Sequence, residues 1–168
     1  MTNVGQVGSH SVACRTASAS DSEFTYAVYA STRVEELARV PWTSEERERF
    51  LRQQFQAQDH TYRNNYPGAE FWIIVVDDTD AGRLYVHRRL DEIRIMDVAL
   101  LPGFRGQGIG TYLLKEFLRE GQMSSRIVTI HVEVFNPALR LYQRLGFSQV
   151  AENGVYCLME WRPSRRRT

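Results

Sequence analysis

The period of apolar and polar positions changes near the middle of the chain. From Phe24 to about Asn65, apolar residues recur at the three- and four-residue spacings of amphipathic helices. Ser20, Asp21 and Ser22 (SDS) offer N-caps for a first helix through FTYAVYASTRVEELARV, with a break near Ser31. The pattern TSEE at 43–46 is typical of a capping box and predicts a second helix that ends near Asn65.

After a turn at 66–68, the pattern becomes that of strands. Three consecutive segments are rich in β-branched and aromatic residues: FWIIVVDD, GRLYVHRR and EIRIMDVALL. The connections between them are short, which predicts two antiparallel hairpins.

The second half of the chain alternates strands and helices. Pro102 and Gly103 stop the third strand, and a glycine-rich run leads into a helix over 108–119 that Gly121 is expected to end. RIVTIHVEVF follows as a strand, expected to lie parallel to a neighbour because a helix precedes it. A short helix, ALRLYQRLGF, is followed by two strands, FSQVAE and VYCLMEW, joined at Asn153-Gly154.

Length and composition indicate one domain. The chain has 168 residues, 43% of them hydrophobic, and a formal net charge of +1, which disfavours nucleic acid as a partner. We expect a flexible N-terminus over 1–11, a first strand near 12–16, one domain over 12–161 and a solvated basic tail over 162–168. The N-terminal residues lack the pattern of a signal peptide, and no stretch is apolar enough to span a membrane, so we predict a soluble, cytoplasmic protein.

The two cysteines give no sign of a metal site. Cys14 and Cys157 lie far apart in the sequence, without a CxxC pair or a neighbouring histidine. We interpret both as reduced thiols without a catalytic role.

The run RGQGIG at 105–110 carries the clearest chemistry. The first N–H groups of a helix lack internal partners and carry partial positive charge, so they favour an anion. Gly106, Gly108 and Gly110 allow a close approach of the backbone, and Arg105 adds a charged donor. The run therefore predicts a pyrophosphate site.

Two better-known phosphate loops fit this run poorly. A Walker A loop needs Lys and then Ser or Thr after its last glycine, whereas Thr111 and Tyr112 follow Gly110. A dinucleotide loop has the order G-x-G-x-x-G, whereas the order here is Gly106-x-Gly108-x-Gly110. A protein that binds ATP or NAD through this run is disfavoured.

The spacing Arg105-x-x-Gly108-x-Gly110 after a strand resembles the acyl-CoA-binding motif of the GNAT acyltransferase superfamily. The segment NPALRLYQRLGF at 136–147 looks like the family segment that closes over the pantetheine arm. The order of elements over nearly all of 12–161 is also similar to the GNAT fold. This resemblance implies an α/β fold with a central mixed β-sheet and helices on both faces.

The resemblance further implies an N-acetyltransferase that uses acetyl-CoA as co-substrate, without a metal. The acetyl group would pass directly to a primary amine. The residues implied to bind the cofactor are Val98, Ala99, Leu100, Arg105, Gly106, Gln107, Gly108, Ile109, Gly110, Thr111, Asn136 and Tyr142.

The resemblance also implies the catalytic residues. Tyr142 matches the usual proton donor to the leaving thiolate, while its alternative role is to fill the core. For the base that deprotonates the amine, we rank Glu133 first, Asp97 second and His131 third, against the alternative of solvent-facing charged residues. Asn136 is expected to cap a helix, to contact the cofactor arm, or both.

The acceptor amine is not specified by any motif. A polyamine, an antibiotic, an amino acid, a protein N-terminus and a lysine all stay open. The aromatic and histidine side chains named as a guess for its pocket are Trp42, Phe71, Trp72, Tyr85, His87 and Tyr156. A GNAT-like sensor that binds acyl-CoA without transfer is the alternative function. Pairing of edge strands in the final hairpin would allow a homodimer.

Overall fold

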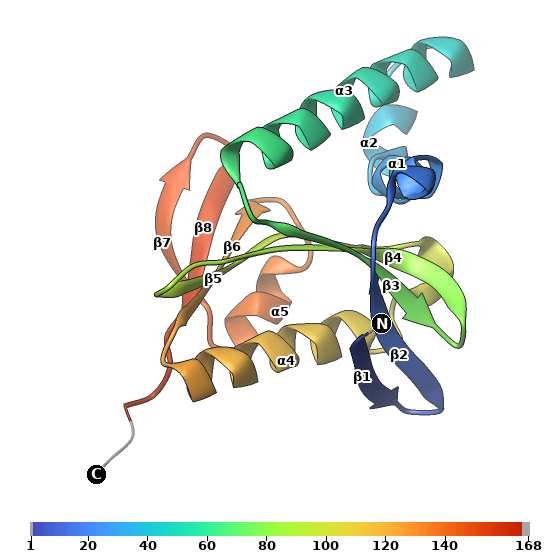
Figure 1. Ribbon diagram of the computed structural model, residues 1–168. Helices are drawn as coiled ribbons and strands as arrows, with labels where there is room; N and C mark the ends of the chain where they lie inside the picture. The colour runs from blue at the N-terminus through green and yellow to red at the C-terminus, as the bar shows by residue number, and fades with distance from the viewer. Residues whose placement is uncertain (1, 166–168) are drawn as a thin grey trace.

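The computed structural model describes residues 2–165 as an eight-stranded mixed sheet with helices on both faces (Figure 1). The strand order is β1-β2-β3-β4-β5-β6-β8-β7. The strands are β1 (Thr2–Val7), β2 (His10–Thr16), β3 (Glu70–Val76), β4 (Thr79–Arg88), β5 (Glu92–Leu100), β6 (Ile127–Glu133), β7 (Ser148–Asn153) and β8 (Tyr156–Trp161). The helices are α1 (Ser22–Ser31), α2 (Val34–Ala38), α3 (Ser44–Asn65), α4 (Ile109–Ser124) and α5 (Leu139–Arg144), with short 3-10 turns at Ala19–Asp21 and Pro102–Phe104. This architecture confirms the predicted fold class.

The first helices form where the sequence predicts them and cover one face of the sheet (Figure 1). The break near Ser31 separates α1 from α2. Thr43 caps α3: its side chain accepts a hydrogen bond from Glu46 N, and the Glu46 carboxylate accepts one from Thr43 N. Tyr26, Tyr29 and Phe55 form a small aromatic core between α1 and α3.

The N-terminus differs from the expectation of a loose segment over 1–11. Residues 2–7 form β1, which pairs antiparallel with β2 at the edge of the sheet. The register shifts between Asn3 and Gly5, and Gly5 takes a φ of 133°, which favours glycine. Met1 lies outside the described residues.

The main core lies between the sheet and helices α4 and α5. Ile109, Leu113, Leu114 and Phe117 of α4 pack against the strands. Gly121 does not end α4, contrary to the prediction. It lies inside the helix, where an added Cβ would meet Arg126 O at 2.9 Å, so it permits the helix to approach the chain closely. The helix ends at Ser124, and its C-cap residue Ser125 has a φ of 57°.

The strands β5 and β6 separate along their length, and this separation creates the site. They run parallel, as predicted, and among the described residues their pairing stops at Ile95 and Ile130. Beyond that point β6 stays paired with β8 as far as Glu133, opposite Tyr156. Within residues 2–165, the end of β5 therefore has β4 on one side and no strand on the other.

The C-terminal hairpin forms as predicted, with β7 at the edge of the sheet. In the tail, Ser164 N donates to Gln122 Oε1 at 2.9 Å, which ties the chain to α4. Residues 166–168 of the predicted basic tail lie outside the described residues.

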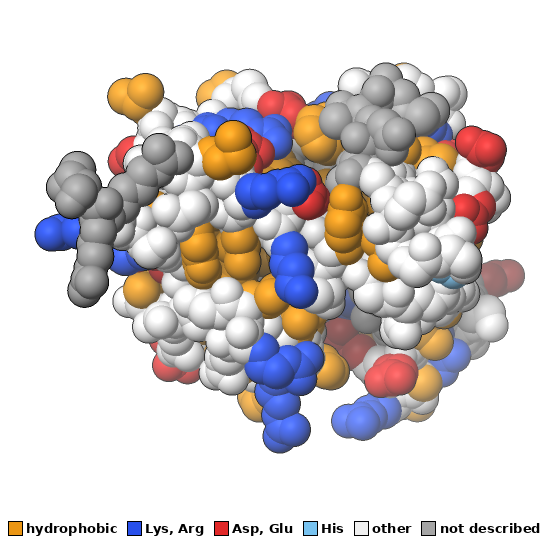
Figure 2. All heavy atoms as spheres, turned by 90° about the horizontal axis from the view of Figure 1, so that it is seen from below, with side chains coloured by type: hydrophobic (Ala, Val, Ile, Leu, Met, Phe, Trp, Pro, Cys, Tyr) orange, Lys and Arg blue, Asp and Glu red, His pale blue; other side chains and the backbone are white. Residues whose placement is uncertain are grey.

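Seen from the α4 side, the basic side chains form a broken row with apolar side chains beside it, rather than one continuous patch (Figure 2). Within residues 2–165, no helix combines the length and apolar character that crossing a bilayer requires.

Candidate active site

A groove of about 1210 Å³, here called the glycine-loop groove, opens where β5 and β6 separate. Its walls are residues 98–100 of β5, most of the run 105–111, residues 135–138 after β6, and Tyr142 of α5. Segments far apart in the sequence therefore meet at one site, as the two sequence motifs imply.

The backbone of the glycine run has the conformation that an anion site needs. Gly106 and Gly108 take φ values of 72° and 83°, and Gly108 precedes the first turn of α4. Within the described part of the chain, the backbone N–H groups of 106–111 have no hydrogen-bond acceptor, and the first internal bond of this turn runs from Tyr112 N to Gly108 O. An added Cβ at Gly106 or Gly110 would meet nothing within 4 Å, so the backbone faces open space. These free donors fit a pyrophosphate.

The side chain of Arg105 has a structural task in addition to lining the groove. Its Nε donates to Leu100 O at 2.8 Å, and its Nη2 donates to Ser31 Oγ at 3.1 Å. It therefore links the end of β5 to α1. Gln107 does not line the groove, and its Nε2 donates to Gly103 O at 2.9 Å.

Tyr142 lies on the groove wall and is 5% exposed. Its ring packs edge-on against Phe147, with centroids 5.9 Å apart. Burial, with the negative charge of Asp97, raises the pKa of Tyr142 to about 12. The phenol therefore stays protonated at neutral pH. Tyr142 therefore packs in the core, which was its alternative role from the sequence, and also lines the groove, while its role as proton donor stays a prediction.

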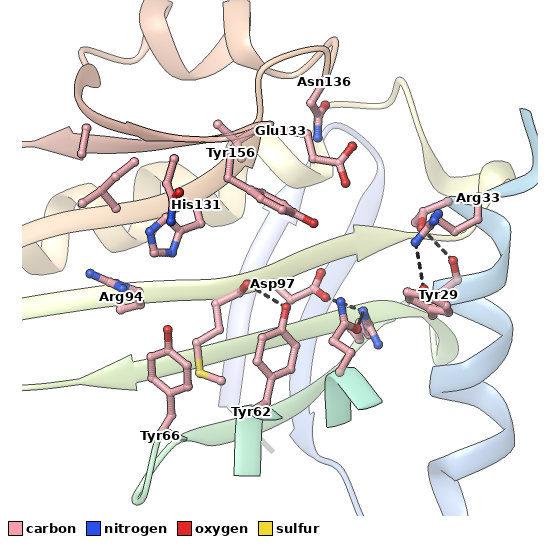
Figure 3. Close-up of a pocket in the computed structure, with 18 of the residues that line it drawn as sticks. Tyr29, Arg33, Tyr62, Tyr66, Arg94, Asp97, His131, Glu133, Asn136 and Tyr156 are labelled. Carbon is pink, nitrogen blue, oxygen red and sulfur yellow. Dashed lines mark hydrogen bonds and ion pairs between the residues drawn. The ribbon is translucent and has the colours of Figure 1, made fainter. Parts of the chain in front are cut away.

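A second hollow of about 610 Å³, here called the central cavity, lies between the helical face and strands β4 to β8 (Figure 3). It contains side chains from α1, α3, β5, β6 and β8, and is of the size that small molecules occupy. Among the residues that the structure describes, the two hollows share Thr32, Arg33, Glu36, Glu133, Asn136 and Tyr156. A molecule in one hollow can therefore contact a molecule in the other.

Glu133 stands at the junction of the two hollows, at the end of β6. Its side chain is exposed and makes no hydrogen bond or ion pair with any described residue. Asn136 lies beside it (Figure 3), and its Oδ1 accepts from Ala138 N at 2.9 Å, which starts the turn into α5. The prediction that Asn136 is the N-cap of this helix is wrong, because α5 begins at Leu139 with Ala138 at the N-cap position, and the Asn136 side chain instead stabilises the turn that precedes the helix.

Asp97 lines the central cavity but is held by an arginine. Its carboxylate accepts a hydrogen bond from Arg83 Nη2, and Arg83 is 2% exposed. Arg83 also donates to Gln58 at 2.8 Å. The buried cation needs this carboxylate, so Asp97 has a structural role.

His131 also lines the central cavity and does not line the glycine-loop groove. Burial and the nearby Arg94 guanidinium lower the pKa of His131, so the ring is neutral at neutral pH.

Of the six residues named for an acceptor pocket, only Tyr156 lines the central cavity. Trp42 packs on Phe50 with centroids 5.1 Å apart, and Phe71 packs on Tyr85 at 4.8 Å. Trp72 belongs to the core on the α4 side of the sheet, where Arg88 lies over its ring. His87 Nε2 forms a hydrogen bond with Pro67 O at 3.0 Å. Their surroundings give these aromatic groups packing roles.

The sequence interpretation missed most of the cavity wall. Tyr62 comes from the last turn of α3, Tyr66 follows the helix as its C-cap, and Arg33 and Glu36 come from the α1–α2 region. No local signal marked these residues, because Tyr66 lies in the turn that follows the helix.

Comparisons with known proteins agree with this geometry. Residues 67–149 match the family model described as an acetyltransferase (GNAT) domain. The fold is similar to that of PaiA N-acetyltransferase from Thermoplasma acidophilum in complex with coenzyme A, with a TM-score of 0.67 and 19% identity, covering 90% of this chain and 99% of that one. An acetyltransferase from Thermus thermophilus gives a TM-score of 0.64 at 16% identity, covering 90% and 96%. RimL, a ribosomal-protein alpha-N acetyltransferase in complex with coenzyme A, gives 0.59 at 18%, covering 95% and 97%. The resemblance stated from the sequence is thereby confirmed.

Proposed function

We propose that this chain, which carries a GNAT acetyltransferase domain, is an acetyl-CoA-dependent N-acyltransferase that acetylates a primary amine in a ternary complex. The observation that supports the proposal best is the junction at Glu133 and Asn136, where the glycine-loop groove meets the central cavity. Direct transfer requires two substrates in adjacent hollows that open onto each other. The coenzyme A complexes of two similar folds are consistent with this arrangement.

The groove would hold the donor mainly through its backbone. The free N–H groups of residues 106–111 would bind the pyrophosphate, together with the charge of Arg105. The open edge of Val98, Ala99 and Leu100 would pair with the amides of the pantetheine arm. Asn136, on the opposite wall, would make a polar contact with that arm.

Acetyl-CoA supplies a thioester whose C–S bond breaks as the bond from the amine nitrogen to the acetyl carbon forms. Glu133 would accept the proton that the amine loses, since it is the ranked carboxylate that lines both hollows. Asp97 is the second candidate and His131 the third. Both line only the central cavity, and Asp97 is already bound to Arg83.

Tyr142 would donate its O–H to the departing sulfur. With a pKa of about 12, its phenol is a weaker acid than an ordinary thiol, whose pKa is about 8.5. A hydrogen bond that stabilises the thiolate is therefore favoured over complete proton transfer. Solvent would protonate the thiolate after the product leaves.

The alternative function is a sensor that binds acyl-CoA without transfer. Calorimetry with acetyl-CoA, combined with measurement of free thiol released across a panel of amines, separates the two. An enzyme binds acetyl-CoA and releases thiol only when an amine is present. A sensor binds and releases none, and absence of binding would contradict both functions.

A further inference from the structure

The central cavity differs in charge between its two ends. The end shared with the glycine-loop groove carries the unpaired carboxylate of Glu133. At the other end, Arg94, His131 and Tyr66 lie together, as Figure 3 shows. An acceptor that enters this cavity meets a negative group near the glycine-loop groove and hydrogen-bond donors away from it.

Arg94 keeps part of its guanidinium available. Its Nε and Nη2 donate to the same oxygen, Glu92 Oε1, at 3.0 and 2.8 Å, and Nε also contacts Thr129 Oγ1 at 3.0 Å. Its Nη1 donates to no residue within 2–165. Glu92 is shared with Arg89, at 3.5 Å, so this carboxylate faces two cations. The cluster therefore retains one net positive charge.

The guanidinium groups of Arg33 and Arg83, which also line the cavity, are less available to bind an added anion. Arg83 is buried and bound to Asp97. Arg33 forms a bidentate pair with Glu36, at 2.6 and 3.1 Å, and its Nη1 donates to Tyr29 Oη at 2.9 Å. Arg94 is thus the cation of the central cavity best able to bind an added anion.

His131 and Tyr66 add neutral hydrogen-bonding groups beside Arg94. The Tyr66 ring is fixed edge-on against His87 and Tyr62, with centroids 5.5 and 6.4 Å apart. Among the described residues, its hydroxyl has no hydrogen-bond partner. The lowered pKa of His131 leaves a neutral ring that can donate one N–H, while Arg94 supplies the charge.

Building on the function proposed above, we propose that Arg94, His131 and Tyr66 bind a carboxylate of the acceptor, whose amine lies at Glu133. The acceptor is then a small aminocarboxylate. Its two charged ends match the two ends of the cavity.

The strand geometry sets the separation between those ends. His131 and Glu133 are next-but-one neighbours on β6 and share a face, so their Cα atoms lie about 7 Å apart. Arg94 is paired with Thr129, which lies two residues before His131 on β6 and therefore further from Glu133. An α-amino acid acetylated on its α-amine carries both groups on one carbon and is too short. A chain of several carbons between amine and carboxylate fits.

The test compares amine probes that vary either the length of the chain or the charge at its far end. Glycine, γ-aminobutyrate and ε-aminocaproate vary the separation, while hexylamine and ε-aminocaproamide remove the charge. For the intact protein, we expect ε-aminocaproate to have a kcat/KM at least about tenfold above hexylamine and the amide, as a charged hydrogen bond implies. Calorimetry in the presence of CoA, which does not allow turnover, should give a lower Kd for ε-aminocaproate than for hexylamine or the amide.

Arg94→Gln should make ε-aminocaproate and hexylamine nearly equal both in kcat/KM and in Kd. Tyr66→Phe should reduce the preference for ε-aminocaproate by a smaller factor. Arg119→Gln removes an arginine from the exposed side of α4 and should leave this preference unchanged. Tyr66→Phe keeps the test valid if Arg94→Gln fails to fold. Equal use and equal binding of the charged and uncharged probes would overturn this inference and leave the proposed function intact. Binding that depends on the carboxylate, without any acetyl transfer, would support this inference and contradict the proposed function.

Discussion

Arg83 and Asp97 lie on neighbouring strands and form an ion pair in the wall of the central cavity. The Arg83 side chain is 3% exposed and that of Asp97 is 15% exposed. Removing one partner of a buried pair leaves the other charge without compensation, at a cost of about 3–5 kcal/mol. This pair therefore contributes to folding, although it borders the candidate site.

We expect Asp97→Asn to lower the free energy of unfolding by about 3–5 kcal/mol, because Arg83 would stay buried without a counter-charge. Denaturant unfolding measures the change. The matched control is Asp97→Asn combined with Arg83→Met, which removes both charges and should recover much of the loss. If the single variant is as stable as the wild type, the pair has no structural role.

Tyr142→Phe should lower kcat by about 10- to 100-fold, the effect of losing a hydrogen bond to a charged group. The Kd for acetyl-CoA should change little, because the ring still packs on Phe147. Since the pKa of Tyr142 is raised to about 12, the wild-type rate should not fall through Tyr142 ionisation below about pH 10. An unchanged kcat would assign Tyr142 to packing alone.

Gly108→Ala should weaken the binding of CoA. Gly108 has a φ of 83°, which costs a residue with a Cβ about 1–2 kcal/mol, and it sets the loop that presents the free N–H groups. Gly103→Ala is the control, because Gly103 has open space around it and does not line the glycine-loop groove. Calorimetry should give a Kd raised by about 5- to 30-fold for Gly108→Ala and unchanged for Gly103→Ala. Equal affinities would contradict a role for this loop in binding the donor.

The stability should fall in acid partly through Asp21. The Arg15 guanidinium, with the N–H of Ser18, lowers the pKa of Asp21 to about 2, and the carboxylate is mostly buried. Because the folded pKa lies below the unfolded one, this stabilisation of about 2 kcal/mol is complete above about pH 5. It is lost as the pH falls towards 2.

Thermal unfolding between pH 5 and 2 measures this effect. Asp21→Asn should be less stable at pH 5, and its Tm should fall less steeply with acid than that of the wild type. Asp91→Asn, at an exposed position, should run parallel to the wild type. Parallel curves for Asp21→Asn would contradict the assignment.

The sequence predicted the elements whose signals are local. The capping box at Thr43 and the Asn153-Gly154 turn each act within a few residues, and both appear as expected. The β1 strand was missed because TNVGQV has only two apolar residues and a glycine at an irregular pairing. The end of α4 was misplaced because Gly121 is needed for tertiary contact, which the sequence does not show.

Some residues of the candidate site are likewise marked by local motifs, and others are brought there only by the fold. The glycine run and Glu133 follow from motifs that are continuous in the chain. The pairing of Arg83 with Asp97 depends on the register of β4 and β5, which shifts at Tyr85 and Val86. Tyr62 and Tyr66, at the end of α3 and just after it, reach the cavity only through packing of helix on sheet. Such residues become visible only in the folded chain.

The most direct test of the proposed function compares Glu133→Gln with the wild type in acetyl-CoA-dependent thiol release, using ε-aminocaproate and hexylamine as acceptors. If Glu133 receives the proton of the amine, kcat/KM for the amine falls by about 10²- to 10⁴-fold. The Kd for acetyl-CoA, measured by calorimetry, should stay unchanged. Wild-type protein that binds acetyl-CoA but releases no thiol with either amine would contradict an enzyme acting on such amines, and a Glu133→Gln variant with wild-type rates would contradict Glu133 as the base.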